Sequence, residues 1–337
     1  MKDTFRPRTL STLFVGVDAG GTRTRALVST GDGRIVGRGL GPGANLWSGD
    51  ATASEAVATA LADAFDGMPA GSVEGGIVAV AGPASARPDL VAEITGAWTR
   101  VGLRGAPHVV PDILAAYRAG TTAPDGVVLV AGTGSVAAAI ADHRIHMRAG
   151  GHGWLVGDEG SAVWLGLAGV RAALRAADRR GPETTLLGRV CDALAIDPST
   201  GERTSSKIVA AVHGRPPAAL GRIALEVTDA ADNGDPVAQE IVAAAVDELV
   251  DMASAVVEEP PPVVVLAGSV IVLSPPINRR VVDRLRATWP ATTIVETVSG
   301  AVGAVAMAIE EDRGAPITDE LLGRLRAQLA APDGHRP

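Results

Sequence analysis

Short apolar runs rich in valine alternate along the chain with longer segments in which alanine and leucine recur at helical spacing. The runs are typical of buried strands, and the longer segments predict helices. Such alternation is typical of α/β proteins, in which helices cover the faces of a sheet. Strands are expected at residues 13–18, 24–29, 34–39, 75–82, 107–112, 126–132, 135–141, 262–268 and 292–297. Helices are expected at residues 50–66, 88–102, 112–119, 160–178, 184–195, 204–213, 217–232, 235–258, 276–288, 299–312 and 317–330.

One long stretch interrupts the strand pattern. Residues 178–233 are rich in charge and broken by proline and glycine, so we assign them to an all-helical insertion in the second half of the chain. The later helix at 299–312 carries small residues, which suit close packing on a sheet, and we assign it to the first half. The polar ends, residues 1–11 and 332–337, are predicted to be flexible tails.

Composition favours a globular protein with enough residues for two domains. Of the 337 residues 47% are hydrophobic, which is sufficient for sizeable cores. A net charge of −8 argues against binding to the phosphate backbone of a nucleic acid. No apolar run reaches the roughly 18 residues of a membrane span, and the opening MKDTFRPRTLS leads into no apolar signal core. We therefore expect a cytoplasmic protein that binds a small molecule.

Two residue types narrow the chemistry further. Cys191 is the only cysteine, which excludes an intramolecular disulfide and a cysteine-built metal site within one chain. Its apolar, helix-like neighbours predict a buried structural thiol. Lys2 and Lys207 are the only lysines, and neither has the context of a P-loop, a protein kinase or a pyridoxal enzyme. A phosphate site in this chain must therefore use backbone N–H groups, hydroxyls, arginine and a metal ion.

Two segments of similar pattern lie about one domain length apart. LFVGVDAGGTRTRALVS and GVVLVAGTGSVAAAIAD each show a strand, a turn of glycine and threonine, and a second strand. Because each turn leads into more sheet, the pattern excludes the strand–loop–helix sites of Rossmann and P-loop proteins. Successive N–H groups in a glycine-rich turn form a concavity that binds anions. Two facing hairpins of this kind could hold a polyphosphate between two domains.

These hairpins resemble the phosphate hairpins of the actin-like superfamily of sugar kinases and chaperone ATPases. DAGGTRT is similar to the first hairpin, AGTGS to the second, and VVVLAGSV to the adenosine loop. The resemblance implies ATP as cofactor, with Mg²⁺ held by Asp18 through water. It implies phosphate contacts from Gly20, Gly21, Thr22, Thr133 and Gly134, and adenosine contacts from Gly268 and Ser269. A lone DxGGT hairpin is often only a turn. The resemblance therefore depends on finding the two hairpins and the adenosine loop together in the same order as in the superfamily.

A narrower resemblance comes from AGGHGWLVGDEGSAVWLG, residues 149–166. This segment looks like the N-acetylglucosamine kinase and BadF/BadG/BcrA/BcrD ATPase family. PGANLW, VVPDILAAYRAG and PDGVVLVAGTGS stand in the family's order, so the likeness covers about residues 13–310. It implies that Asp112 is the base toward the sugar hydroxyl. It also implies a sugar site that includes Asn45, Gly151, His152 and Asp158.

Several of these residues also have a structural interpretation. Asp112 stands between a strand and a helix, where aspartate is common as an N-cap. Asp158 and Glu159 precede a helix, where acidic side chains interact favourably with the helix dipole. His152 stands where the family usually has tryptophan, in GGHG instead of GGWG, and it could merely fill that space. The sugar pocket is therefore expected to differ from that of the family.

The resemblance implies an α/β fold of two actin-like (ribonuclease H-like) domains with a cleft between them. Residues 13–118 plus 299–312 would form the N-terminal domain, and residues 119–298 would form the C-terminal domain with its helical insertion. The implied activity is ATP-dependent phosphorylation of N-acetylglucosamine to its 6-phosphate by a homodimer, without a nucleic-acid or membrane partner. Glucosamine kinase is the nearest alternative. More distant ones are the ATPase activator of a dehydratase, which needs cluster-bridging cysteines, and a sugar sensor without catalysis.

Overall fold

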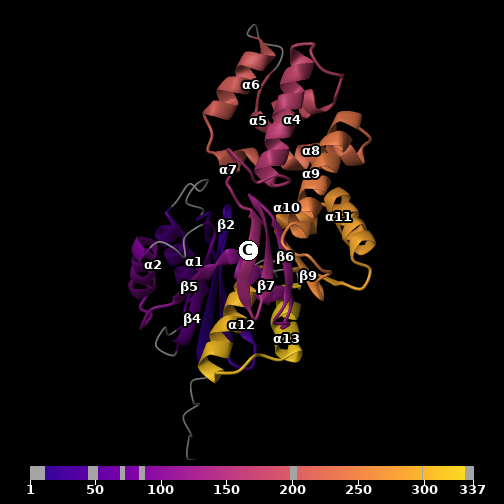
Figure 1. The fold of residues 1–337 in the computed structure, drawn as a ribbon. Helices are drawn as coiled ribbons and strands as arrows, with labels where there is room; N and C mark the ends of the chain where they lie inside the picture. Colours follow the sequence, from indigo (N-terminus) through magenta and orange to yellow (C-terminus); the bar gives the residue numbers. More distant parts are fainter. Residues whose placement is uncertain are drawn as a thin grey trace, which may run out of the picture.

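The chain forms two five-stranded sheets of the same topology, each flanked by helices (Figure 1). The computed structural model describes residues 12–44, 52–68, 73–82, 88–197, 203–297 and 299–330. In each sheet, three consecutive antiparallel strands are joined by two later strands that run parallel to the first of the three. The predicted α/β fold is therefore confirmed. The likeness between the two glycine hairpins reflects this repeated sheet.

The first sheet has the order β3-β2-β1-β4-β5. Its strands are β1 (Leu13–Ala19), β2 (Arg23–Thr30), β3 (Ile35–Pro42), β4 (Val73–Val80) and β5 (His108–Pro111). Apolar side chains of β1 and β4 alternate between two cores, one on each face of the sheet. One face packs against α1 (Ala53–Ala64) and α2 (Pro88–Arg100). The other packs against α12 (Gly300–Arg313) and α13 (Asp319–Ala330).

The second sheet has the order β10-β9-β6-β7-β8. Its strands are β6 (Gly126–Ala131), β7 (Ser135–Ala141), β8 (Arg144–Gly150), β9 (Val263–Ala267) and β10 (Thr293–Thr297). One face forms a core with α9 (Pro236–Ser254), α10 (Ser269–Leu273) and α11 (Pro275–Thr288). The other face packs against α3 (Asp112–Gly120).

A group of helices projects beyond the second sheet, at the top of Figure 1. These helices are α4 (Ala162–Ala177), α5 (Leu186–Leu194), α6 (Thr204–His213), α7 (Pro217–Leu220) and α8 (Ile223–Asp232). They enclose a small apolar core of their own, which contains Cys191 as a buried free thiol. Within the described ranges, no helix combines the length and the apolar character that a membrane span requires.

The structure differs from the predicted elements in three places. The single helix expected at 217–232 is two helices, α7 and α8, because the chain turns at Gly221 against Ala162 of α4. α10 was not predicted, since SVIVL continues the apolar run of β9 and five residues are too few to show helical spacing. β8 was not predicted either, because it is an edge strand whose side chains are mostly exposed.

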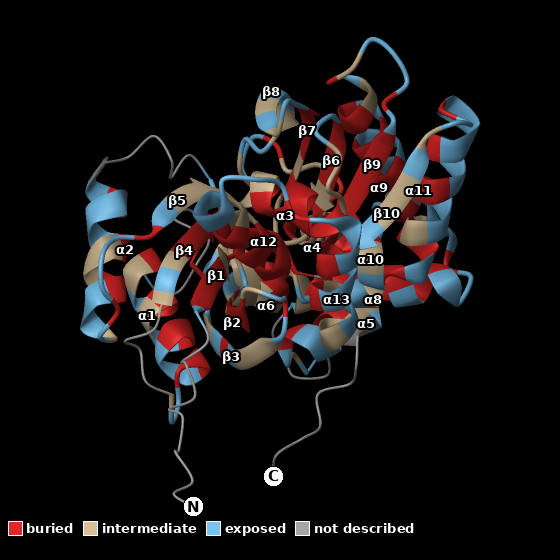
Figure 2. Ribbon diagram, turned by 90° about the horizontal axis from the view of Figure 1, so that it is seen from below, coloured by how far each residue is buried: buried red, intermediate tan, exposed pale blue. Residues whose placement is uncertain are grey.

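α3 and α12 lie between the two sheets and are buried along most of their length (Figure 2). Arg118 of α3, only 3% exposed, forms an ion pair with Glu310 of α12. It also donates to Nδ1 of His143, in the turn between β7 and β8, at 2.7 Å. This buried guanidinium therefore links α3 to α12 and to the second sheet.

Gly303→Ala in α12 is expected to destabilise the protein by about 1–3 kcal/mol, the usual range for overpacking a tight interior. A Cβ at Gly303 would lie 1.9 Å from the carbonyl oxygen of Ala115 in α3. That oxygen belongs to the backbone, so no side-chain rotation relieves the clash. The free energy of unfolding, from urea titration, measures the effect.

Gly323→Ala in α13 is the matched control. Gly323 is also helical, but no atom lies within 4 Å of a Cβ at that position. Alanine there should stabilise the helix by about 0.5–1 kcal/mol. Equal stability of Gly303→Ala and the unsubstituted protein would show that α3 and α12 do not depend on this close approach.

Candidate active site

A cavity of about 1450 Å³ lies where the two sheets, the helical group and α10 meet. All residues that the sequence analysis selected line it, except Asn45, which lies outside the described residues. They come from segments far apart in the sequence: the ends of β1, β5, β6, β8 and β9 and the loops that follow them. Such convergence of polar residues on one large cavity is typical of a ligand site.

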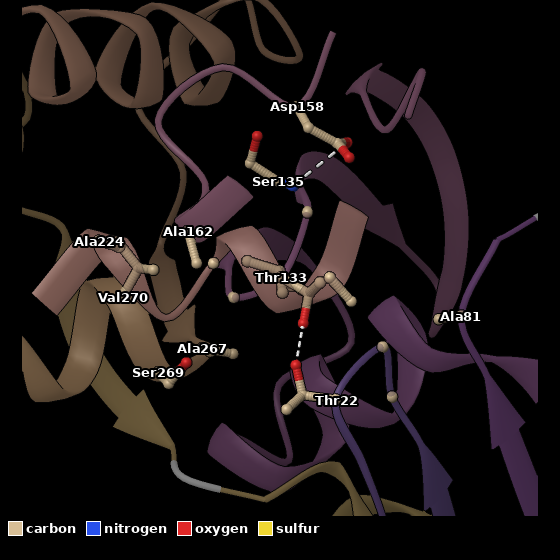
Figure 3. A pocket seen from close by; sticks show the side chains of 18 of the residues that line it. Thr22, Ala81, Thr133, Ser135, Asp158, Ala162, Ala224, Ala267, Ser269 and Val270 are labelled. Carbon is tan, nitrogen blue, oxygen red and sulfur yellow. Dashed lines mark hydrogen bonds between the residues drawn. The ribbon is translucent and has the colours of Figure 1, made fainter. Parts of the chain in front are cut away.

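The two glycine hairpins face each other across this cavity (Figure 3). The hydroxyls of Thr22, in the β1–β2 turn, and Thr133, in the β6–β7 turn, are hydrogen-bonded at 2.6 Å. A Cβ at Gly21 would lie 2.9 Å from Thr133 Oγ1, so glycine is needed for the hairpins to approach this closely. The turns thus present hydroxyls and backbone N–H groups to one shared space.

Asp18 is the one polar side chain of β1, and its carboxylate lines the cavity. Oδ2 accepts a hydrogen bond from the backbone N–H of Gly300, the first residue of α12, at 3.0 Å. Burial raises the pKa of Asp18, and the guanidinium of Arg25 on the neighbouring strand opposes that rise. The positive end of the helix dipole favours the ionised form of this carboxyl group. An ionised carboxylate that lines the cavity can bind a cation.

Asp112 is the first residue of α3, and the N-cap position belongs to Pro111. Its Oδ1 accepts from the N–H of Ile113 at 2.8 Å, while the carboxylate faces the cavity. Burial, and secondarily the negative charge of Asp18, raises the pKa of Asp112 to about 7. A carboxyl group with a pKa near neutrality can accept a proton from a substrate and release it again.

Asp158 lies beside the second hairpin and not merely ahead of a helix. Its Oδ1 accepts from the N–H of Ser135 at 3.4 Å (Figure 3), and its backbone is left-handed, with φ of 57°. A Cβ at Gly134 would lie 2.8 Å from Asp158 Oδ2, so glycine makes room for this carboxylate. Burial raises the pKa of Asp158, while the nearby His152 acts in the opposite direction.

Gly268 and Ser269 join β9 to α10 at another side of the cavity. The φ of Gly268 is 91°, and a Cβ there would lie 2.4 Å from the carbonyl oxygen of Ala131. Only glycine fits this turn, which starts α10 beside the second hairpin. Both residues line the cavity together with residues of α7 and α8.

Sequence analysis missed several residues that line the cavity. Arg148 of β8 was missed because that strand was not predicted. Arg25 of β2 faces Asp18, which the antiparallel register of β1 and β2 could have indicated. Exposed apolar side chains also border the space, and their pattern along the sequence gave no sign of it: Leu155, Val156, Leu225 and Leu273.

Comparison with known proteins identifies relatives of this chain. This chain is 29% identical over 183 residues to an N-acetylmuramic acid/N-acetylglucosamine kinase of Clostridium acetobutylicum. The match spans 54% of this chain and 60% of that protein. A candidate N-acetylglucosamine kinase from Chromobacterium violaceum has a similar structure, with a TM-score of 0.70, 24% identity and coverage of 88% of this chain and 98% of that one.

A more distant likeness links the chain to a ROK family glucokinase from Streptomyces griseus, whose structure contains glucose and AMPPNP. The TM-score is 0.55 at 21% identity, over 88% of this chain and 99% of that one. The sequence model of the BadF/BadG/BcrA/BcrD ATPase family matches residues 15–308, which is most of the chain. The protein therefore belongs to the BadF/BadG/BcrA/BcrD ATPase family.

Proposed function

We propose that this protein is an ATP-dependent amino-sugar kinase that converts N-acetylglucosamine to N-acetylglucosamine 6-phosphate. The observation that carries the proposal is the arrangement of Asp112 and Asp18 in the same cavity as two facing hairpins of glycine and threonine. This set provides a base, a cation ligand and a polyphosphate cradle, which are the parts that phosphoryl transfer needs. The names of the relatives support an amino sugar as the acceptor.

Asp112 is the proposed base. Its carboxylate would accept the proton of the 6-hydroxyl as the oxygen attacks the γ-phosphorus. The raised pKa makes Asp112 a stronger base than an exposed aspartate while leaving a substantial ionised fraction near neutral pH.

The hairpins and the β9–α10 turn would bind the nucleotide. Gly20, Gly21 and Thr22 offer N–H groups and a hydroxyl on one side, and Thr133 and Gly134 offer them on the other. Gly268 and Ser269 would lie against the adenosine.

Asp18 would hold Mg²⁺, in part through water. Among the described residues, no group of three or more histidine, cysteine or acidic side chains is arranged to hold a metal ion. This fits Mg²⁺, which often takes one or two carboxylates and completes its coordination with water and substrate phosphates. The ion, when bound, neutralises charge on the phosphates.

Gly151, His152 and Asp158 would contact the sugar, together with Asn45. PGANLW places Asn45 beside Leu46 and Trp47, an amide with apolar neighbours that suits a neutral acetamido group. A free amine is cationic near neutral pH and would favour a carboxylate instead. His152 would repel that cation when protonated. The acetylated sugar is therefore the proposed acceptor.

A coupled assay of ADP release over a panel of hexosamines tests the proposal. N-acetylglucosamine is expected to have a higher kcat/KM than glucosamine, and Asn45→Ala should reduce that preference by about 1–3 kcal/mol. Leu40→Ala, an exposed β3 position outside the cavity lining, is the control and should not alter the preference.

A higher kcat/KM for glucosamine would contradict the sugar pocket and leave a glucosamine kinase. Absence of turnover with every hexosamine would contradict the kinase proposal itself. The proposal also includes a cytoplasmic homodimer, whose mass light scattering would measure.

A further inference from the structure

Arg148 is an exposed arginine on the acceptor side of the cavity, in the second half of β8. Among the residues that the structure describes, it forms no hydrogen bond or ion pair through its side chain. Its charge nevertheless acts on Asp112 and lowers the pKa of that carboxyl, against the larger effect of burial. The guanidinium therefore lies near the proposed base and has donors available for a ligand.

Phosphoryl transfer is faster when a positively charged side chain lies beside the transferred group in addition to the metal ion. Negative charge spreads over the oxygens of the transferred group in the transition state, and positioned charges supply much of the catalysis. The turns of the two hairpins contribute N–H groups and hydroxyls, and Arg23 follows the first of them. Lys207 of α6 donates to the carbonyl of Asp197 and does not line the cavity, and Lys2 lies outside the described residues. Arginine is the basic side chain that the lining provides.

The other arginines of the lining are less suitably placed. Arg25 stands opposite Asp18 in the β1–β2 ladder, and its charge acts on that carboxylate. Arg222, between α7 and α8, lines the end of the cavity that the helical group forms. Arg23 begins β2 at the first hairpin, in the other sheet from the strand that leads to Gly151 and His152. Arg148 lines the cavity on the strand that leads directly into Gly151 and His152, the proposed sugar contacts, and its charge acts on Asp112.

We propose that Arg148 is a catalytic residue that binds the γ-phosphoryl group during its transfer. The inference rests on the proposed kinase function. The sugar 6-oxygen forms a bond to the γ-phosphorus, and the bond from phosphorus to the β–γ bridging oxygen breaks, with its electron pair leaving on ADP. The hydroxyl proton passes to Asp112. Arg148 keeps its own proton and donates N–H hydrogen bonds to the transferred oxygens.

Steady-state kinetics of Arg148→Ala and Arg148→Lys in the full chain test this role. Arg148→Ala is expected to lower kcat about 100-fold while the KM for sugar and for ATP stay within about 3-fold, as for a contact made in the transition state. Arg148→Lys should retain part of the activity, because it keeps the charge and loses the fork of donors. Added guanidinium ion should restore part of kcat to Arg148→Ala. Arg144→Ala, at the exposed start of the same strand and outside the cavity lining, is the matched control.

A binding measurement separates charge stabilisation from other roles. ADP with aluminium fluoride, Mg²⁺ and sugar mimics the transferring phosphoryl group. Arg148→Ala should bind this mixture about 100-fold more weakly than the unsubstituted enzyme and bind ADP with sugar unchanged. A raised sugar KM with kcat retained would show that Arg148 holds the acceptor, and unchanged kinetics would show no role; either overturns the inference.

The two proposals fail in different ways. If the unsubstituted enzyme phosphorylates a hexosamine and Arg148→Ala does so equally well, only the role of Arg148 is lost. If no hexosamine is phosphorylated, the kinase proposal fails, and the same variants are compared in ATP hydrolysis and in aluminium fluoride binding. Equal values there would overturn the role of Arg148 as well.

Discussion

Asp112→Asn is expected to lower kcat by about 100-fold or more while the KM values for sugar and ATP change little, because the amide cannot accept the hydroxyl proton. Asparagine has nearly the same shape and keeps an oxygen to accept from the N–H of Ile113. The start of α3 should therefore remain intact. Steady-state rates at saturating substrates measure the change, with circular dichroism to confirm the fold.

Asp319→Asn provides the control for this substitution. Asp319 is also the first residue of a helix, α13, and bonds to Thr122 away from the cavity. Its replacement should leave kcat unchanged. Near-normal turnover of Asp112→Asn would remove Asp112 from the mechanism.

The pH dependence of the same position gives a second readout. A base must be ionised, so with a pKa of about 7 for Asp112, kcat/KM should rise with pH up to about that value.

The stability of the protein should change with pH in the opposite direction. The folded pKa lies above the value of roughly 4 in the unfolded chain, so the folded state binds more protons and loses stability as pH rises from about 4 to 7. Asp112→Asn removes this loss, and its Tm should exceed that of the unsubstituted protein by about 2 °C or more at pH 7.5, with a smaller difference at pH 5.

Asp18→Ala is expected to lower kcat/KM by about 1000-fold and to shift the Mg²⁺ titration to higher concentration, since a lost metal anchor costs several kcal/mol. The variant also leaves the N–H of Gly300 without its carboxylate partner. Initial rates over a Mg²⁺ series measure both effects. Asp32→Ala, in the turn between β2 and β3, is the control for loss of an aspartate near the same sheet. An unchanged Mg²⁺ titration for Asp18→Ala would refute its role as a metal ligand.

The fold was largely predictable because its strands are apolar and its turns carry glycine. The buried strand β9 is a continuous apolar run, and β1 is apolar apart from Asp18, so both strands are recognisable from the sequence alone. β8 alternates polar and apolar residues over RIHMRA, which is typical of a half-buried strand, but the alternation is short and the side chains of this edge strand are mostly exposed, so it is less conspicuous than the apolar runs. α10 depends on the left-handed turn at Gly268, a conformation that apolar spacing does not encode.

The residues of the candidate site were predictable only where they belong to a local sequence motif. Asp18 and Thr133 stand in recognisable hairpins, and Asp158 stands in GDEGS. The sequence does not say that Asp158 lies against Gly134, because that contact joins residues on separate loops. It also gives no sign that Arg148 lies near Asp112, since the two reach the cavity from different sheets. Distances between elements depend on packing, and packing is not local in sequence.

In the proposed kinase, the hydrogen bond between Thr22 and Thr133 would have to break before a phosphate could lie between their hydroxyls. With 2.6 Å between the two oxygens, no phosphate fits between these two hydroxyls in this arrangement. A polyphosphate that contacts both hydroxyls would enter only during the intervals in which Thr22 and Thr133 move apart. At high nucleotide concentration the observed rate of association would therefore stop rising and level off at the rate of that opening, whatever the final affinity.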